Sequence, residues 1–302
     1  MSVKAARLAL SDNMSVEQAF QAIAFNCLAQ MRGNEDSVAI GDDVESLHQM
    51  RVGMRRLRSA LGMFKGLLRL PDDAQRELDW LAKELGDARD WDVLAGSTLP
   101  ALVRALADPK PIDGLQQAAR DEVTEHRASA AAAVGSRRYI RLMRNLARWV
   151  QTMGWRNDKT ALAAAGAPLA KPVRKFARKI LKRDQRRLRT CAANLRAATP
   201  EARHRIRIAA KKTRYAAEFF ESLFAPKSMR PYIKALTRLQ EELGLLNDAA
   251  VADRLLTDMV AGQPQLEAGA GFARGFLAAR VKKDGKAIIK RWKTFARLGR
   301  PR

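Results

Sequence analysis

The sequence predicts an all-α fold made of two related helical bundles that pack into one compact domain. Alanine, leucine, arginine and glutamate dominate, and runs of β-branched residues are absent, which favours helices over strands. Apolar residues recur with a period close to 3.6 in nearly every segment, as expected of amphipathic helices. A basic segment also occurs twice, about half the chain apart, and this indicates a repeated structural unit.

The apolar period places a series of helices along the chain. They are expected near residues 15–31, 43–68, 74–96, 112–133, 136–153, 168–196, 200–224, 229–246, 248–261, 264–281 and 284–298. Residues that favour helix starts stand at the expected N-termini of the two basic helices. Asp43 and Thr199 are good N-cap residues, and Pro200 takes a first-turn position where no N–H is needed.

The repeat covers a basic helix and the helix that follows it. Residues 48–58 match residues 204–214 at an offset of 156, and every basic position of the first copy has a basic counterpart in the second. Residues 78–93 match residues 236–251 at an offset of 158, with seven identities in sixteen positions. The small change of offset requires only a short loop insertion.

The repeat also predicts the domain organisation. We expect two copies of one helical unit, packed around a pseudo-twofold axis. The expected limits are 12–298 for the whole domain, 12–153 for the first repeat, 154–168 for the linker and 169–298 for the second repeat.

The net charge of +24 points to a polyanionic partner, because so much uncompensated charge repels itself in a folded protein. The excess is concentrated: residues 170–215 contain 17 basic residues and two acids. Two cysteines without disulfide or zinc-site spacing fit a reducing compartment. With no long apolar run and no leader-like N-terminus, we expect a cytoplasmic protein without a transmembrane segment.

The two basic helices each carry their charges on one side. At 100° per residue, the histidine and three cations of each copy fall within an arc of about 80°, and the apolar residues lie opposite. Arg56 and Lys212 share a flank of the stripe. The two stripes consist of His48, Arg51, Arg55 and Arg58 in the first copy and of His204, Arg207, Lys211 and Arg214 in the second.

Two other helices repeat this design. The stripe after Pro172 consists of Lys175, Arg178, Lys182, Arg186 and Arg189, and the stripe near residue 140 includes Arg137 and Arg141. Such stripes are usually solvated helix faces, which carry mixed charges. These contain almost no acid, so neighbours three and four residues apart repel by roughly 0.2–0.5 kcal/mol each. A bound polyanion would reverse that cost.

The motifs hold no set of residues for metal binding or catalysis. Neither histidine has a cysteine or second histidine at ligand spacing, and no nucleophile or orienting carboxylate lies within the motif. A neutral imidazole that donates to an anion is the more economical role. The paired acids, Glu84 with Glu242 and Asp90 with Asp248, are expected to brace arginines, and the alternative is a site for catalytic Mg²⁺.

The paired pattern His-x-x-Arg-x-x-x-Arg/Lys-Arg/Lys-x-Arg, each copy followed by Leu-Gly-x-x-x-Asp, resembles the CHAD family, the conserved histidine α-helical domain. The resemblance implies two pseudo-symmetric four-helix bundles with basic side chains along a central channel or groove. It also implies binding of inorganic polyphosphate and association with polyphosphate granules. By position, the stripes of the two basic helices would face the ligand, with Arg56, Lys212 and the stripe on the helix after Pro172.

We therefore expect a non-catalytic, cofactor-free protein that binds inorganic polyphosphate. Polyphosphate has no bases, so its site needs cations and no stacking platform, and aromatic residues make up only 6% of this chain. The stripes consist mostly of arginine, which also suits phosphate, because a guanidinium group can donate two parallel hydrogen bonds to phosphate oxygens. The alternatives are a general polyanion or nucleic-acid binder and, with less support, an enzyme acting on phosphoanhydrides.

Overall fold

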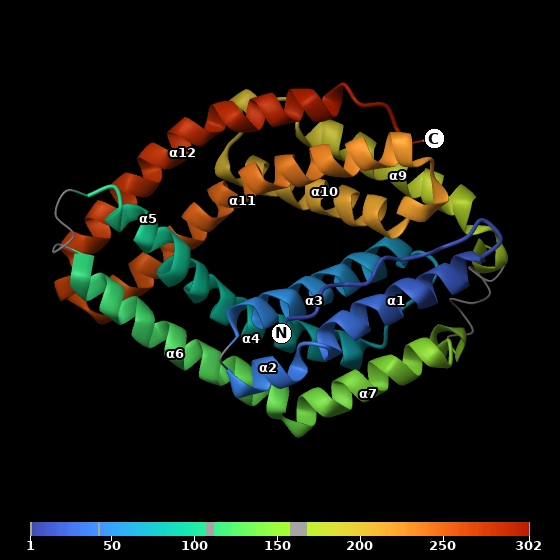
Figure 1. Cartoon of the computed structure of the whole chain (residues 1–302), viewed down its shortest axis with the longest axis horizontal. Coiled ribbons are helices and arrows are strands. Elements are labelled where there is room, and N and C mark those ends of the chain that lie inside the picture. Colours follow the sequence, from blue (N-terminus) through green and yellow to red (C-terminus); the bar gives the residue numbers. More distant parts are fainter. Residues whose placement is uncertain (1, 42, 107–111, 158–167, 302) are drawn as a thin grey trace.

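The computed structural model describes residues 2–41, 43–106, 112–157 and 168–301, and its regular elements are helices (Figure 1). The first half contains α1 (Val16–Arg32), α2 (Glu35–Ile40), α3 (Val44–Phe64), α4 (Asp72–Val93), α5 (Leu99–Val103), α6 (Asp113–Gly135) and α7 (Arg137–Gln151). The second half contains α9 (Val173–Cys191), α10 (Pro200–Phe219), α11 (Pro226–Gly262) and α12 (Glu267–Ala296). The all-α fold class is confirmed.

The starts of the two basic helices follow from their capping residues. The Asp43 carboxylate accepts a hydrogen bond from the Glu45 amide (2.9 Å), and the Thr199 hydroxyl accepts one from the Ala202 amide (3.3 Å). Each bond satisfies one of the amides that a helix start leaves unpaired. Pro200 occupies the first turn of α10, as predicted.

Two predicted breaks are wrong. Residues 226–262 form one helix, α11, where helices were expected over 229–246 and 248–261, and α12 is continuous where helices were expected over 264–281 and 284–298. Each helix stays continuous because apolar residues on both sides of the expected break are packed against the rest of the protein. Leu243 and Leu256 of α11 are buried, as are Leu277 and Ile288 of α12.

Several other limits differ from the predictions. The short helices α2 and α5 were not expected, and a π-helical turn, Leu94–Thr98, separates α4 from α5. The third basic helix is shorter than expected, with limits Val173–Cys191 instead of 168–196. The predicted linker falls largely on residues 158–167, which lie outside the described part of the chain.

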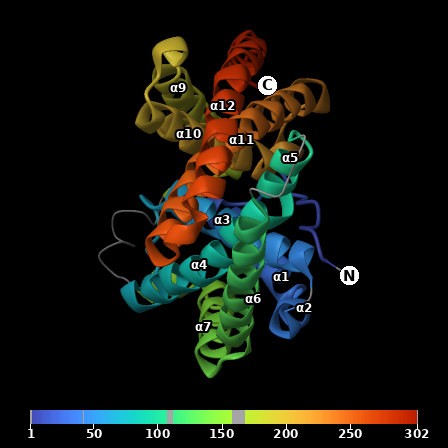
Figure 2. The same cartoon turned by 90° about the vertical axis from the view of Figure 1, so that its left-hand side faces the viewer.

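The two halves pack against each other through their basic helices and the helices that follow them. In each half the basic helix lies between two neighbours: α1 and α4 flank α3, while α9 and α11 flank α10. Across the halves, α3 contacts α10 and α4 contacts α11. Figure 2 shows the same division, with α9–α12 on one side and α1–α4, α6 and α7 on the other.

One large apolar core runs through both halves, and a second core joins α4–α6 to α11 and α12. In the large core the Phe176 ring of α9 lies between the paired residues Phe64 and Phe220, with centroid distances of 4.8 and 6.2 Å. A short antiparallel bridge between Ser15 and Pro172 connects the starts of α1 and α9. The pseudo-twofold relation between the halves stays a prediction. Among the described helices, none combines the length and apolar composition needed to span a bilayer.

Gly53 lets α3 approach α1 closely. A Cβ atom at this position would lie 3.0 Å from the Met31 side chain, 3.2 Å from the Cys27 carbonyl oxygen and 3.3 Å from the Met31 amide nitrogen. Two of these neighbours are backbone atoms of α1, which cannot move away without shifting the helix. Gly62 on the same helix has open space around its Cα.

We expect Gly53→Val to lower the free energy of unfolding by about 1–3 kcal/mol, because the added atoms overpack the contact with α1. The matched change Gly62→Val is expected to alter stability by about 0.5 kcal/mol or less, as is usual for an unconstrained surface site. Urea denaturation monitored by helical circular dichroism measures both. Equal stability of the two variants would contradict the close packing at Gly53.

Candidate functional site

Four cations from the two halves meet where α3 packs against α10. They are Arg51 and Arg55 of α3 and Arg207 and Lys211 of α10, and we call them the central cationic cluster. The charges of Arg207, Arg55 and Arg51 all act on Lys211, and those of Arg55 and Arg51 act on Arg207. The structure therefore unites the centres of the two predicted stripes in one electrostatic neighbourhood.

Burial of these like charges makes the charged state costly. Burial, followed by the charges of Arg207 and Arg55, lowers the pKa of Lys211 from 10.5 to about 8. Burial also lowers the pKa values of Arg55 and Arg207. The Nε atoms of both arginines are buried and have no hydrogen-bond partner among the described residues. Buried donors of this kind are normally paired, so the cluster offers unsatisfied sites to an anion.

Acids brace only part of the cluster. Arg51 donates through Nη1 to the Asp90 carboxylate (3.0 Å) and to the Gly86 carbonyl oxygen (2.7 Å). The prediction that the paired acids orient arginines is confirmed for Asp90. The matching Asp248 lies near Arg207 and Arg55, and burial raises its pKa above the usual value.

The second pair of acids also differs between the halves. Glu242 forms an ion pair with Arg291 of α12 (3.1 Å), which is a bracing contact, while Glu84 lies near Lys83 and Arg138. Among the residues that the structure describes, no group of three or more His, Cys, Asp or Glu side chains is arranged to hold a metal ion.

The two motif histidines lie in different environments. His48 is half-buried, and its pKa is lowered first by burial and then by the charges of Arg89 and Arg55. It is therefore a neutral imidazole at pH 7, as the proposed donor role requires. His204 is exposed and lines the edge of a pocket between α10, α11 and α12.

Arg89 of α4 belongs to this site and was missed by the sequence analysis. Its charge lowers the pKa values of both His48 and Asp248, which places it beside the central cationic cluster. The comparison of the repeats concealed it, because the matched position in the second half is Asn247. Its position directly before the paired Asp90 was the available signal.

The outer members of the two stripes are engaged by other side chains. Arg58 forms an ion pair with Asp79 (2.7 Å). Arg214 binds Glu218 and Gln240 and lies 4.8 Å from the centre of the Tyr215 ring. Their charges still act on the cluster, since Arg58 contributes to the lowered pKa of Lys211 and Arg214 to that of Arg55.

Arg56 and Lys212, which share a flank in the sequence, are separated in the structure. Arg56 donates to the Asn26 side chain (2.9 Å) and lies 5.3 Å from the centre of the Phe219 ring, so it packs in the contact between the halves. Lys212 is exposed and lines a pocket of about 450 Å³ together with Arg186 of α9. The structure thus unites Lys212 with the α9 stripe.

The remaining α9 residues are spread over the surface. Lys175 and Lys182 are exposed. Arg178 and Arg189 line a pocket of about 570 Å³ near the C-terminal residues, and Arg189 donates to the Ala296 carbonyl oxygen (2.9 Å). No α9 cation is among the charges that act on Arg55, Arg207 or Lys211 in the described structure.

Arg137 and Arg141 are exposed on α7, which packs against α1, α4 and α6. Both views show α7 at the edge of the first half that lies away from α10 (Figures 1 and 2). The structure therefore does not bring this stripe together with the cations of α10.

The fold and the site define an all-helical protein in which helices of two halves share one cationic cluster. The family model of the CHAD domain matches residues 22–257, and the chain belongs to the CHAD domain family. The predicted resemblance is thus confirmed.

Solved structures similar to the chain include two whose identity is informative. The crystal structure of the CHAD domain from the plant Ricinus communis is 39% identical, with a TM-score of 0.87, and the match covers 100% of this chain and 99% of that one. PptA from Streptomyces chartreusis is 16% identical, with a TM-score of 0.67, over 93% of this chain and 100% of that one, which shows likeness of fold alone. No curated protein is significantly similar.

The lowered pKa of Lys211 predicts an unusual dependence of stability on pH. Between about 8 and 10.5 the unfolded chain binds more protons at this lysine than the folded protein does. The contribution of Lys211 to the free energy of unfolding therefore rises with pH over this range. We expect Lys211→Met to stabilise the protein at pH 7 and to remove this rise.

Urea denaturation at pH 7, 8 and 9.5 tests this expectation, with Lys212→Met as the matched control because its side chain is exposed. The control is expected to keep the pH dependence of the unchanged protein. A Lys211→Met variant with an unaltered pH dependence would show that the central lysine is solvated.

Proposed function

We propose that the protein binds inorganic polyphosphate through the central cationic cluster and does not cleave it. The observation that carries the proposal is the meeting of four half-buried cations from two helices, with the Nε atoms of Arg55 and Arg207 left without partners in the described structure. A chain of phosphates would supply both the missing acceptors and the missing negative charge. Membership of the CHAD domain family agrees with this ligand.

The surroundings of the cluster favour polyphosphate over single-stranded nucleic acid. Binding of unpaired bases generally uses exposed aromatic rings as stacking platforms. The rings on the two basic helices are instead buried: Phe64, Tyr215, Phe219 and Phe220 are all at most 1% exposed. The chemistry that the site offers is bidentate hydrogen bonding from arginine guanidinium groups to phosphate oxygens.

We further propose that this binding takes the protein to polyphosphate granules in the cytoplasm. The charged faces of α9 would then extend the contact beyond the cluster, since its exposed cations continue the positive surface. A fluorescent fusion in cells with and without polyphosphate distinguishes granule recruitment from a diffuse distribution.

Neutralising the cluster should weaken polyphosphate binding at least about a hundredfold and reduce the slope of log affinity against log salt by about three, because four phosphate contacts are lost. The test variant carries Arg51→Gln, Arg55→Gln, Arg207→Gln and Lys211→Gln. The matched control removes the same charge from α7 by Arg137→Gln, Arg141→Gln, Arg144→Gln and Arg148→Gln, and its slope should change by less than about one.

Titrations at about 50 mM and about 200 mM salt measure both variants with polyphosphates of several lengths, duplex DNA, single-stranded RNA and heparin. Thermal unfolding of each variant verifies that the fold is retained. If both variants lost the same affinity for polyphosphate, binding would depend on the overall charge and not on the central cationic cluster. Equal affinity for all polyanions at matched charge would favour a general polyanion binder.

The absence of catalysis is tested separately. We expect no phosphate release above background when the protein is incubated with long-chain polyphosphate and Mg²⁺, because the acids near the cluster are engaged with or close to arginines. A colorimetric phosphate assay makes the measurement. Release that disappears in an Asp90→Asn, Asp248→Asn double variant with unchanged binding would identify an enzyme instead.

A further inference from the structure

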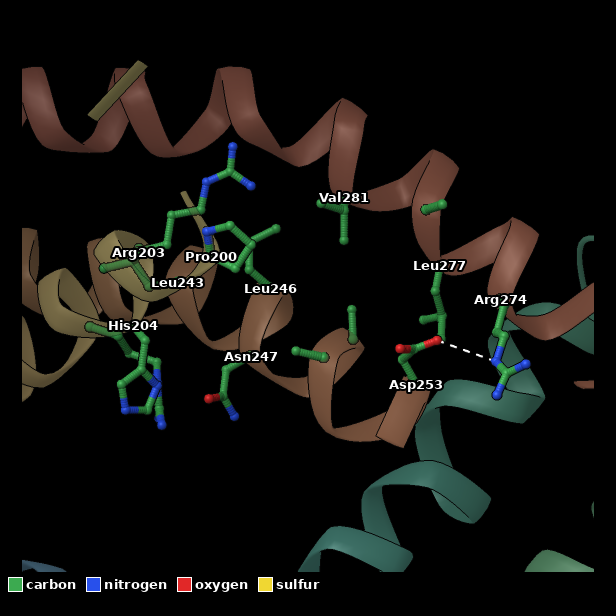
Figure 3. A pocket seen from close by; sticks show the side chains of 14 residues that line it. Pro200, Arg203, His204, Leu243, Leu246, Asn247, Asp253, Arg274, Leu277 and Val281 are labelled. Atoms are coloured by element: carbon green, nitrogen blue, oxygen red, sulfur yellow. Dashed lines mark ion pairs between the residues drawn. The ribbon is translucent and has the colours of Figure 1, made fainter. Parts of the chain in front are cut away.

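A pocket of about 290 Å³ opens between the first half of α10, the middle of α11 and the middle of α12 (Figure 3). Its wall is aliphatic: Leu243, Leu246, Leu277 and Val281 line it with several alanines. No Phe, Tyr or Trp is among the described lining residues. This volume lies near the lower end of the range for small-molecule sites, which are mostly apolar with a few polar groups.

The first half of the chain fills the matching place with large side chains. At the repeat offsets, Arg203 corresponds to Leu47, Ala249 to Trp91 and Ala250 to Asp92. Leu47 and Trp91 are 4% and 5% exposed, and Asp92 is buried in an ion pair with Arg127 of α6 (2.7 Å).

In the second half, two alanines replace the indole and the ion-paired carboxylate, and Ala250 is exposed. Protein interiors are close-packed, so unfilled volume at positions that are packed in the other copy is exceptional. The pocket thus arises from substitutions at specific matched positions.

The edge of the pocket is cationic. Arg203, His204 and Arg207 line it, and the buried Nε of Arg207 has no hydrogen-bond partner in the described structure. The nearby acid Asp253 is already paired with Arg274 (3.3 Å). Figure 3 shows Arg203 on the side towards α12, with His204 and Asn247 extending towards the opposite side.

We propose that this pocket binds a small aliphatic anion. Its hydrocarbon chain would lie against the leucines of α11 and α12, and its carboxylate or phosphate head would contact His204 and Arg207. A nucleotide fits less well, because the described lining residues include no Phe, Tyr or Trp on which a base could stack. Both head groups are anions that accept hydrogen bonds from these two side chains. The titration below compares their affinities.

The proposed ligand would also compete with polyphosphate. Arg207 belongs to both the pocket edge and the central cationic cluster, so an anion held there removes one cation from the longer ligand. This second step rests on the proposed function. Binding to the pocket itself does not depend on it.

Calorimetric titration with straight-chain carboxylates and alkyl phosphates of about six to about twelve carbons tests the pocket. Each added methylene should raise the affinity about fourfold until the pocket is full. The alcohol of the same length should bind about tenfold to a hundredfold more weakly, because it lacks the charge-assisted hydrogen bonds. Affinity independent of chain length would overturn the proposal.

The matched variants place the ligand. Ala250→Leu and Ala278→Leu each add volume inside the pocket and should abolish binding, whereas Ala279→Leu adds the same volume at the neighbouring exposed position, outside the lining, and should not. Two filling variants are used so that a folding defect in one leaves the test intact. Unchanged binding in a folded filling variant would overturn the proposal.

Competition is then measured by adding the aliphatic anion to the polyphosphate complex. Displacement that is lost in Ala278→Leu supports the shared use of Arg207, and simultaneous binding of both ligands excludes it. If polyphosphate does not bind at all, the proposed function fails, while the direct titration still decides the pocket.

Discussion

The burial of apolar faces forces the cations of α3 and α10 together, and the rest of the site depends on this contact. Met54 and Leu57 of α3 and Ile206 and Ala210 of α10 are at most 2% exposed in one core that runs through both halves. Each helix has its charges on the side opposite its apolar face. Packing on one core fixes the two helices against each other, and their cations lie close enough to lower the pKa values of Arg207 and Lys211. Hydrophobic burial, which is worth about 25 cal/mol per Å² of apolar surface, offsets the repulsion.

The protonation states show how this repulsion is accommodated. Lys211 has a pKa of about 8, and burial with neighbouring arginines keeps His48 neutral at pH 7. The arginines stay charged, because a guanidinium does not lose its proton at physiological pH even when burial lowers its pKa. The site is thus a fixed set of arginines with two groups, a lysine and a histidine, whose protonation an incoming anion would favour.

The sequence was sufficient to predict the fold class and the centre of the site, because both depend on helical periodicity and on the repeat. Arg51, Arg55, Arg207 and Lys211 were identified from their phase on single helices. Phase alone cannot show which stripe faces another, so Arg137 and Arg141 were grouped with them although α7 lies elsewhere. Arg56 was included for the same reason, and only its contacts with α1 and α10 show that it packs. The continuity of α11 and α12 depends on tertiary packing, which a local pattern does not record.

Divergence between the two copies gives the halves different parts in the site. In the first half Arg51 is paired with Asp90, and the place beside His48 is packed with Leu47, Trp91 and the Asp92–Arg127 pair. In the second half Arg207 has an unpaired Nε, His204 is exposed, and the same place is open. In the first copy Arg51 is therefore held in place by an acid, while the buried Nε of Arg55 is unpaired in the described structure, like that of Arg207. Both copies supply a guanidinium with an unpaired Nε in the described structure, and the second copy adds an accessible apolar wall beside it.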